Sequence, residues 1–219
     1  MNAWLDHYRR IYYPLLNVRY EPYHDNGIPV SGIIAEGFCN RAIGFDIIFR
    51  LMLSQKQSNF NIIETGTTRV YGNWMDGQSS VLFTDFVNRC GGQVRSVDLD
   101  PEACAAARNN INSDQFSIAQ SDSVSWLRQQ TDLAQVDLFY LDSYDVDWTD
   151  DTASAEHHLK EFKIIEPQLK SGAVVVVDDN TRWLNNNRRT GKGRAIVEYL
   201  ELTRNKLPIY DEYQIIFQF

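Results

Sequence analysis

The sequence predicts an α/β fold, with a doubly wound, mostly parallel sheet, helices on both faces and an N-terminal helical cap. From Phe60 onward, short β-rich runs alternate with patterns of helical period, which is typical of βαβ units. The run Ala173–Val177 suits a central strand that is buried on both faces. The 219 residues contain no internal repeat and no linker-like stretch, so we expect one domain.

Residues 1–57 are expected to form the cap, as part of the same domain as residues 58–219. Apolar residues from Trp4 to Tyr12 fall on one face of a helix, which should end at Pro14. The segment Ala42–Leu53 is apolar almost all round, which predicts a buried helix.

The later part of the chain predicts the sheet and its crossover helices. Strands are expected near 60–64, 93–98, 115–119, 136–141 and 172–177, and a buried final strand within 213–219. Helices are indicated by the apolar spacings Leu82/Phe86/Cys90, Ala103–Ala107, Val124/Leu127, Leu159/Phe162/Ile165/Leu169 and Ile196/Tyr199/Leu200.

Composition narrows the class of protein. Asp and Glu number 29 against 21 Lys and Arg, so the net charge of −8 argues against nucleic acid or an anionic membrane as partner. No apolar run approaches the ~18 residues of a membrane-spanning helix, and the N-terminus lacks the apolar core of a secretory signal. The three cysteines show no metal-ligand spacing and suit free thiols in a reducing compartment. We therefore expect a cytoplasmic protein.

Carboxylates follow nearly every predicted strand. The residues concerned are Glu64, Asp98, Asp122, Asp142, Asp178 and Asp179. Ligands of open parallel sheets bind at the carboxyl ends of the strands. Carboxylates gathered at one edge repel one another unless something cationic or hydrogen-bonding compensates them, which indicates a site.

The turns after the first two strands favour a nucleoside with a cationic group. Neither a G-x-G-x-x-G motif nor a P-loop is present, so pyrophosphate binding is not indicated. Glu64 has the right sign for an amino group, and Asp98 can accept both hydroxyls of a ribose. Asp100 before Pro101 is typical of a helix N-cap. Asp122 can meet an adenine amino group or cap its own helix, and both alternatives stay open.

From Asn61 to Val177 the chain resembles class I S-adenosyl-L-methionine (SAM)-dependent methyltransferases. The resemblance rests on E-x-G at Glu64–Gly66, V-D-x-D-P at 97–101 and S-D-S at 121–123. It implies a Rossmann-like, seven-stranded sheet that binds SAM. The cofactor-binding residues that it implies are Glu64, Thr65, Gly66, Gly77, Ser79, Asp98 and Asp122. Residues 67–76 look like an insertion in the glycine loop, either a lid or a change in which glycine contacts the cofactor.

A second resemblance is to the metal-dependent small-molecule O-methyltransferases of the catechol and macrolide-sugar types. It rests on LFYLDSYDVD and on GAVVVVDDN. It implies that Asp142, Asp178 and Asp179 hold Mg²⁺ or another divalent cation, and that Asp142 is catalytic. Asp145 stands where the catechol type has a lysine, and it is a candidate general base. Asp147, His157 and His158 are further candidates.

The expected function is transfer of the methyl group of SAM to a hydroxyl of a small-molecule acceptor, assisted by Mg²⁺. Acceptor contacts are expected from the cap, the insertion and residues 180–189, with Trp74 and Trp183 as walls. Two alternatives stay open. One is a metal-independent methyltransferase that acts on another nucleophile, and the other is a non-catalytic module that binds an adenosyl cofactor.

Overall fold

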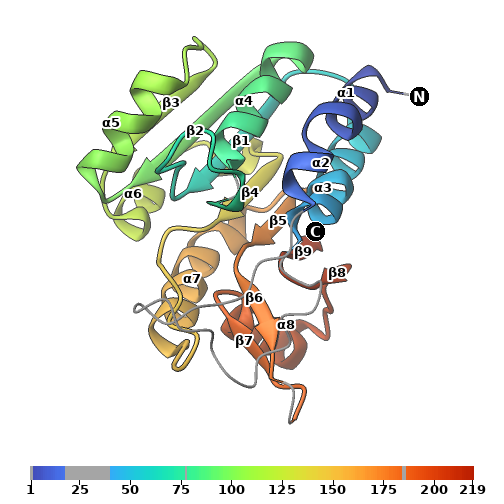
Figure 1. Ribbon diagram of the computed structural model, residues 1–219. Coiled ribbons are helices and arrows are strands. Elements are labelled where there is room, and N and C mark those ends of the chain that lie inside the picture. The colour runs from blue at the N-terminus through green and yellow to red at the C-terminus, as the bar shows by residue number, and fades with distance from the viewer. Residues whose placement is uncertain (1, 18–39, 77, 184–185) are drawn as a thin grey trace.

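The computed structural model describes residues 2–17, 40–76, 78–183 and 186–219 (Figure 1). Its strands are β1 (Phe60–Thr65), β2 (Gly92–Asp98), β3 (Phe116–Gln120), β4 (Leu138–Leu141), β5 (Val174–Val177), β6 (Asn180–Arg182), β7 (Arg189–Gly191), β8 (Tyr210–Asp211) and β9 (Ile215–Gln218). Its α-helices are α1 (Ala3–Ile11), α2 (Tyr13–Leu16), α3 (Arg41–Gln55), α4 (Ser79–Cys90), α5 (Pro101–Asn110), α6 (Ser123–Gln129), α7 (Thr152–Ile165) and α8 (Arg194–Arg204). Short 3-10 helices are η1 (Trp74–Asp76), η2 (Leu133–Gln135) and η3 (Glu166–Gln168).

Seven strands form one sheet in the order β3-β2-β1-β4-β5-β9-β8. The first five are parallel, and β9 pairs antiparallel with both β5 and β8. The predicted doubly wound, seven-stranded fold is therefore confirmed. The strand order reverses between β1 and β4, and their carboxyl ends form the edge where such sheets bind ligands.

Both faces of the sheet are buried, which explains the near-continuous apolar strands. On β4, Leu138 and Tyr140 pack into one core, while Phe139 and Leu141 pack into the other. Successive side chains of a strand point to opposite faces, so a strand covered on both sides needs apolar residues throughout. Helices α3 and α4 contribute to the first core, and α7 and α8 to the second (Figure 1).

The N-terminal helices pack on the face of the sheet that α4 also covers. Trp4 and Tyr8 of α1 are buried and meet Phe49 of α3 edge to face, with ring centroids 5.0 and 5.3 Å apart. Helix α1 ends before Pro14, which lies in the first turn of α2. The predicted buried helix begins at Arg41, where Asn40 caps it by accepting from the N–H of Ala42.

Two features after β5 add to the sequence-based expectation. Within the segment expected to contact the acceptor, Asn180–Arg182 (β6) pairs antiparallel with Arg189–Gly191 (β7). The last strand is confirmed, and it runs antiparallel to β5. Among the described residues, no helix combines the length and the apolar character needed to cross a membrane.

Candidate functional site

The site begins at the turn after β1, where Gly66 has a φ of +86°. Its N–H donates to the carbonyl of Val97 on β2, at 2.8 Å. A Cβ at this position would lie 2.6 Å from the backbone oxygen of Asp142, after β4. Glycine is thus required both by the positive φ and by the close approach of the turn to the end of β4.

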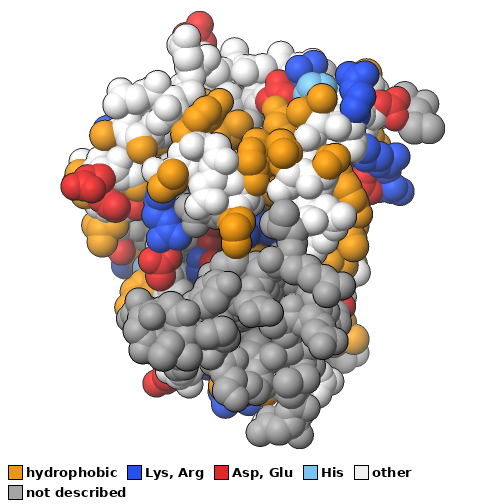
Figure 2. All heavy atoms as spheres, in the orientation of Figure 1, with side chains coloured by type: hydrophobic (Ala, Val, Ile, Leu, Met, Phe, Trp, Pro, Cys, Tyr) orange, Lys and Arg blue, Asp and Glu red, His pale blue; other side chains and the backbone are white. Residues whose placement is uncertain are grey.

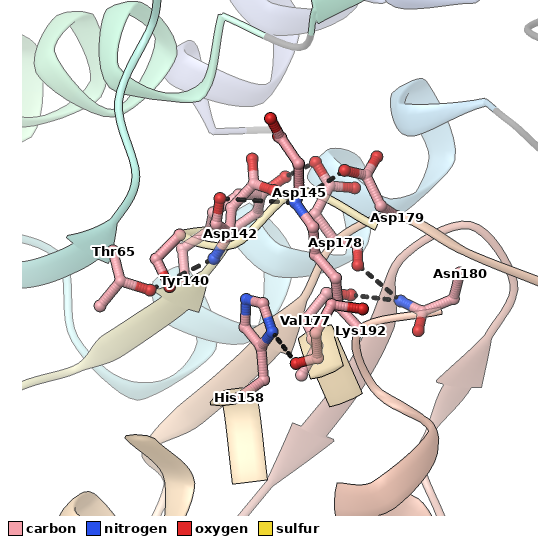
Figure 3. A network of polar contacts seen from close by, with 12 residues as sticks. Thr65, Tyr140, Asp142, Asp145, His158, Val177, Asp178, Asp179, Asn180 and Lys192 are labelled. Atoms are coloured by element: carbon pink, nitrogen blue, oxygen red, sulfur yellow. Dashed lines mark hydrogen bonds and ion pairs between the residues drawn. The ribbon is translucent and has the colours of Figure 1, made fainter. Parts of the chain in front are cut away.

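The predicted acidic residues converge at the ends of β4 and β5, but two cations lie among them (Figure 3). Lys192 pairs with Asp142 and lies 2.7 Å from Asp179. Arg41, the first residue of α3, lies 2.7 Å from Asp178 and 2.9 Å from Asp179. The three carboxylates are therefore held by two basic side chains of the same chain.

Tyrosine hydroxyls complete this network. Tyr140 donates to Asp178 at 2.7 Å, and Tyr213 donates to Asp179. Asp179 adopts a left-handed backbone with a φ of +53°, which is uncommon for a residue other than glycine. Such a conformation persists only where the surroundings fix it, as the contacts of Asp179 do here.

The charges of the network favour fixed ionisation of Lys192. Burial acts to lower the pKa of Lys192, but Asp142 and Asp179 outweigh it, and the pKa lies above its usual range. Burial acts to raise the pKa of Asp179, but Lys192 and Arg41 hold it below its usual range. Lys192 is thus an ammonium and not a proton acceptor at neutral pH.

A second buried network lies on the α7 side of the same strand ends. Glu161 accepts from Ser143 at 2.6 Å and from Thr65 at 3.3 Å. His158, below Asp142 in Figure 3, is completely buried and bonds to the carbonyl of Ser154 through Nδ1, at 2.7 Å. Burial lowers the pKa of His158 to about 4, so the ring is neutral. His158, a candidate base from the sequence, is therefore a buried residue of α7 that does not line the cavity.

A cavity of about 290 Å³ opens at this edge of the sheet. Its lining includes Arg41, Gly66, Thr67, Arg69, Asp98, Leu99, Asp142, Asp145, Asp179 and Lys192. At the rim, Asp145 is largely exposed and pairs with Arg69 at 3.0 Å. The cavity has the position and the mixed polar lining of a small-molecule site.

The predicted cofactor residues divide into two groups. Gly66 and Asp98 line the cavity. Glu64, Thr65 and Ser79 are buried behind its lining, with Glu64 accepting from Ser80 and Ser96 through Oε2, at 2.6 and 2.5 Å. The other oxygen of Glu64, Oε1, is buried and has no partner among the described residues.

Asp122 and Gly77 complete the predicted set. Asp122 caps α6 by accepting from the N–H of Ser125 at 2.8 Å, which supports one of its two proposed roles. It does not appear in the cavity lining. Asp100 caps α5 as expected, accepting from Glu102. Gly77 lies outside the described residues.

The carboxylates fit a divalent cation poorly. Both oxygens of Asp179 and one of Asp142 already accept from Lys192, Arg41 or Tyr213. Asp178 does not line the cavity. Within the described ranges, no group of three or more His, Cys, Asp or Glu side chains is arranged to hold a metal ion. The predicted metal centre is thus an ion-pair network, because a metal must compete with buried cations for the same oxygens.

The residues 67–76 are tied to the body of the protein. The carbonyl of Met75 accepts from Arg41 at 2.9 Å, and Gln78 bonds to the backbone of both Val70 and Gly72, each at 2.9 Å. Trp74 packs on Tyr12, with centroids 5.6 Å apart. Figure 2 shows apolar side chains gathered over this part of the surface, near α1 and α2.

The two tryptophans expected to wall the acceptor do not line the cavity. Trp183 packs instead with Trp148 and Tyr213. Arg182, within the segment 180–189 that was expected to contact the acceptor, pairs with Asp211 at 2.5 Å. Trp183 and Arg182 thus contact the C-terminal part of the fold.

Sequence reasoning did not identify Arg41, Lys192 or Glu161. Each is a charged residue that the fold buries: Arg41 is 7% exposed, Lys192 1% and Glu161 0%. One signal was available for Lys192, which stands between Gly191 and Gly193. A Cβ at Gly191 would lie 2.2 Å from the backbone oxygen of Asp179, so the glycine lets the lysine segment pass close to the acidic pair.

A family model described as a methyltransferase domain matches residues 72–180, about half of the chain. No curated protein matches the sequence significantly. Two solved structures share the fold at a TM-score of 0.50: an rRNA methylase from Streptococcus thermophilus, 9% identical, and SMU.1697c from Streptococcus mutans in complex with SAH, 14% identical.

The two streptococcal structures cover 80% and 78% of this chain, and 95% and 96% of their own. MycE, a methyltransferase from the mycinamycin biosynthetic pathway in complex with Mg and SAH, is 16% identical with a TM-score of 0.44. That match covers 64% of this chain, which spans about a third of the length of MycE (34%).

Proposed function

We propose that this chain is a class I, SAM-dependent methyltransferase that transfers the methyl group of SAM to a hydroxyl of a small-molecule acceptor. One observation carries the proposal: Gly66, Asp98 and the Lys192–Asp142 pair line a single cavity at the point where the strand order reverses. In this proposal, the turn at Gly66 contacts the cofactor and the Asp98 carboxylate accepts hydrogen bonds from its ribose hydroxyls. The Lys192–Asp142 pair faces the molecule that receives the methyl group.

The residues around Gly66 fit the cofactor. Asp98 presents a carboxylate to the cavity, with Oδ1 also accepting from the N–H of Asp100 at 2.9 Å. A carboxylate can accept from both hydroxyls of a ribose. The buried Oε1 of Glu64, behind the turn, has no partner among the described residues, which leaves a hydrogen-bond acceptor at this turn. SAM, when bound, supplies an electrophilic methyl group, whose bond to sulfur breaks as the acceptor oxygen bonds to carbon, leaving S-adenosylhomocysteine (SAH).

The chain supplies the proton acceptor. The hydroxyl proton of the acceptor must leave as its oxygen forms the new bond. Asp142 faces the cavity, and Asp145 lies at its rim, so each can take this proton and pass it to solvent. Lys192 fixes the carboxylate of Asp142 in place through its ion pair. Arg41 and Arg69 line the same cavity and give it positive charge.

The small polar cavity favours a small acceptor over a macromolecule. The net charge of −8 also disfavours nucleic acid, although the streptococcal structure of similar fold is an rRNA methylase. Transfer assisted by Mg²⁺, implied by the resemblance to catechol-type enzymes, would require displacement of Lys192. We therefore propose the hydroxyl acceptor without a metal-dependent step.

The proposal is tested by incubating the protein with SAM bearing a trideuterated methyl group and a panel of phenols, sugars and nucleotide-sugars. Mass spectrometry should show one labelled methyl on an oxygen of an acceptor, with an equal amount of SAH. The variant Asp142→Asn with Asp145→Asn should form far less product and bind SAH normally. Label transferred only to nitrogen or sulfur acceptors would refute the hydroxyl assignment, and SAH binding without any turnover would favour the non-catalytic module.

A further inference from the structure

We infer that Lys192 is a built-in cation in the place where the acidic edge of the sheet would otherwise bind a divalent metal, so the chain works without one. This inference rests on the proposed function, because it concerns the charge that faces the acceptor. Three observations carry it, and each concerns a different property of the site.

The first observation is the position of the ammonium. The Nζ atom of Lys192 bonds to Asp142 after β4 and lies 2.7 Å from Asp179 after β5. It therefore bridges the ends of two adjacent strands, as Figure 3 shows. A divalent cation shared by these carboxylates would have to lie between the same oxygen atoms, and hard cations choose carboxylate oxygens.

The second observation is the direction of approach. The side chain of Lys192 is 2% exposed, yet the residue lines the cavity. It reaches Asp142 and Asp179 from the segment after β7, where Gly191 and Gly193 allow close backbone packing. Asn180 fixes this segment by accepting from the N–H of Gly193 at 2.7 Å. The ammonium is thus held rigidly and is not a surface lysine that can swing away.

The third observation is the charge behind Lys192. Arg41 neutralises Asp178 and also contacts Asp179, at 2.7 and 2.9 Å. With all three carboxyl groups ionised, the two cations leave this network with a net charge of −1. A divalent ion added to this network would meet two fixed positive charges at short range, and their repulsion is strong where water is excluded. Binding of the ion and retention of Lys192 are therefore mutually exclusive.

The inference predicts that removing the ammonium creates a metal site. In Lys192→Met, the side chain keeps its length and loses its charge, so Oδ1 of Asp142 and Oδ2 of Asp179 lose the cation that they share. The matched control is Lys170→Met. Lys170 Nζ lies 2.6 Å from Asp137, a buried carboxylate at the opposite end of β4 that also pairs with Lys56.

The test is titration of Mn²⁺ into each protein, with free ion read by electron paramagnetic resonance and stability read by thermal unfolding. Wild type and Lys170→Met should show no saturable Mn²⁺ binding in the titrated range. Lys192→Met should bind one Mn²⁺ per chain, with a dissociation constant at least about tenfold below the weakest binding that the titration can detect. Saturable binding of one Mn²⁺ by the wild type would overturn the inference, as would a folded Lys192→Met that binds Mn²⁺ no better. If Lys192→Met does not fold, the wild-type titration still decides.

The proposed function is tested separately by SAH binding and by methyl transfer in the presence of EDTA. Activity that survives EDTA, with no Mn²⁺ site in the wild type, supports the inference. Activity that EDTA abolishes and Mg²⁺ restores overturns it and leaves the methyltransferase assignment intact. A wild type that does not bind SAH contradicts the proposed function, whatever the Mn²⁺ titration shows, so the two failures are distinguishable.

Discussion

The guanidinium of Arg41 lies 2.7 Å from the carboxylate of Asp178, although 137 residues separate the two in the sequence. Arg41 begins α3 and Asp178 follows β5, so this pair fastens the N-terminal helices to the functional edge of the sheet. Arg41 also donates to the carbonyl of Met75 in the insertion, at 2.9 Å. The helices before β1 therefore help to build the site as well as cover the core.

Loss of this pair should destabilise the protein strongly. In Arg41→Met, Asp178 keeps a buried carboxylate without its cation, which costs about 3–5 kcal/mol of unfolding free energy. Urea denaturation measures this loss. The control is Arg9→Met, which removes a partly exposed pair with Asp46 at 2.8 Å and should cost less than about 1 kcal/mol. Equal losses of unfolding free energy in the two variants would show that the buried pair contributes no more to stability than the partly exposed one.

Glu64 should make stability depend on pH. Burial raises the pKa of Glu64 from 4.5 to about 7 in the folded protein. Between these values the folded state holds a proton that the unfolded state releases, so stability from this group falls as pH rises from about 4.5 to 7 and then levels off. The free energy of unfolding of the wild type, minus that of Glu64→Gln, should fall by up to about 3 kcal/mol between pH 4.5 and 7. A difference independent of pH would contradict the buried, protonated state.

Asp98 should contribute to cofactor affinity, and Asp122 to stability. Asp98→Ala should weaken SAH binding about tenfold or more, because a hydrogen bond to a charged group is worth about 1.5–3 kcal/mol. Asp122→Ala should cost about 1 kcal/mol of stability through loss of the α6 cap and leave SAH affinity unchanged. Calorimetric titration and urea denaturation of both variants separate the two roles. A large loss of SAH affinity in Asp122→Ala would support the alternative that Asp122 contacts the adenine amino group.

Gln78 should hold residues 67–76 in place. Its side chain, 1% exposed, bonds to the N–H of Gly72 and the carbonyl of Val70, each at 2.9 Å. Gln78→Ala should cost about 1–2 kcal/mol of stability and weaken SAH binding if this loop covers the cofactor. The exposed Gln129→Ala is the matched control. Unchanged SAH affinity with lower stability would limit the loop to a structural role.

The fold could be predicted because its signals are local. Apolar strands, helical spacings and turn residues such as Asp100–Pro101 each act over a few positions, and the order of strands and helices then restricts the topology. The small sheet of β6 and β7 was not predicted, because three-residue strands with polar residues carry no periodic signal.

The site could be predicted only in part. Asp142, Asp178 and Asp179 were expected to converge because parallel strands end at one edge, and they do. Their cations come from α3 and from the segment after β7, and no local pattern links those segments to the acidic residues. Metal ligands and ion-paired carboxylates look the same in a sequence. The difference lies in charges brought close only by folding.

The most direct test of the account is calorimetric titration of SAH into the wild-type protein and into Asp98→Ala. The account predicts one site per chain in the wild type, binding at least about tenfold weaker in the variant, and no response to NAD⁺ or ATP in either. Absence of SAH binding to the folded wild-type protein, or equal affinity in the two proteins, would contradict it.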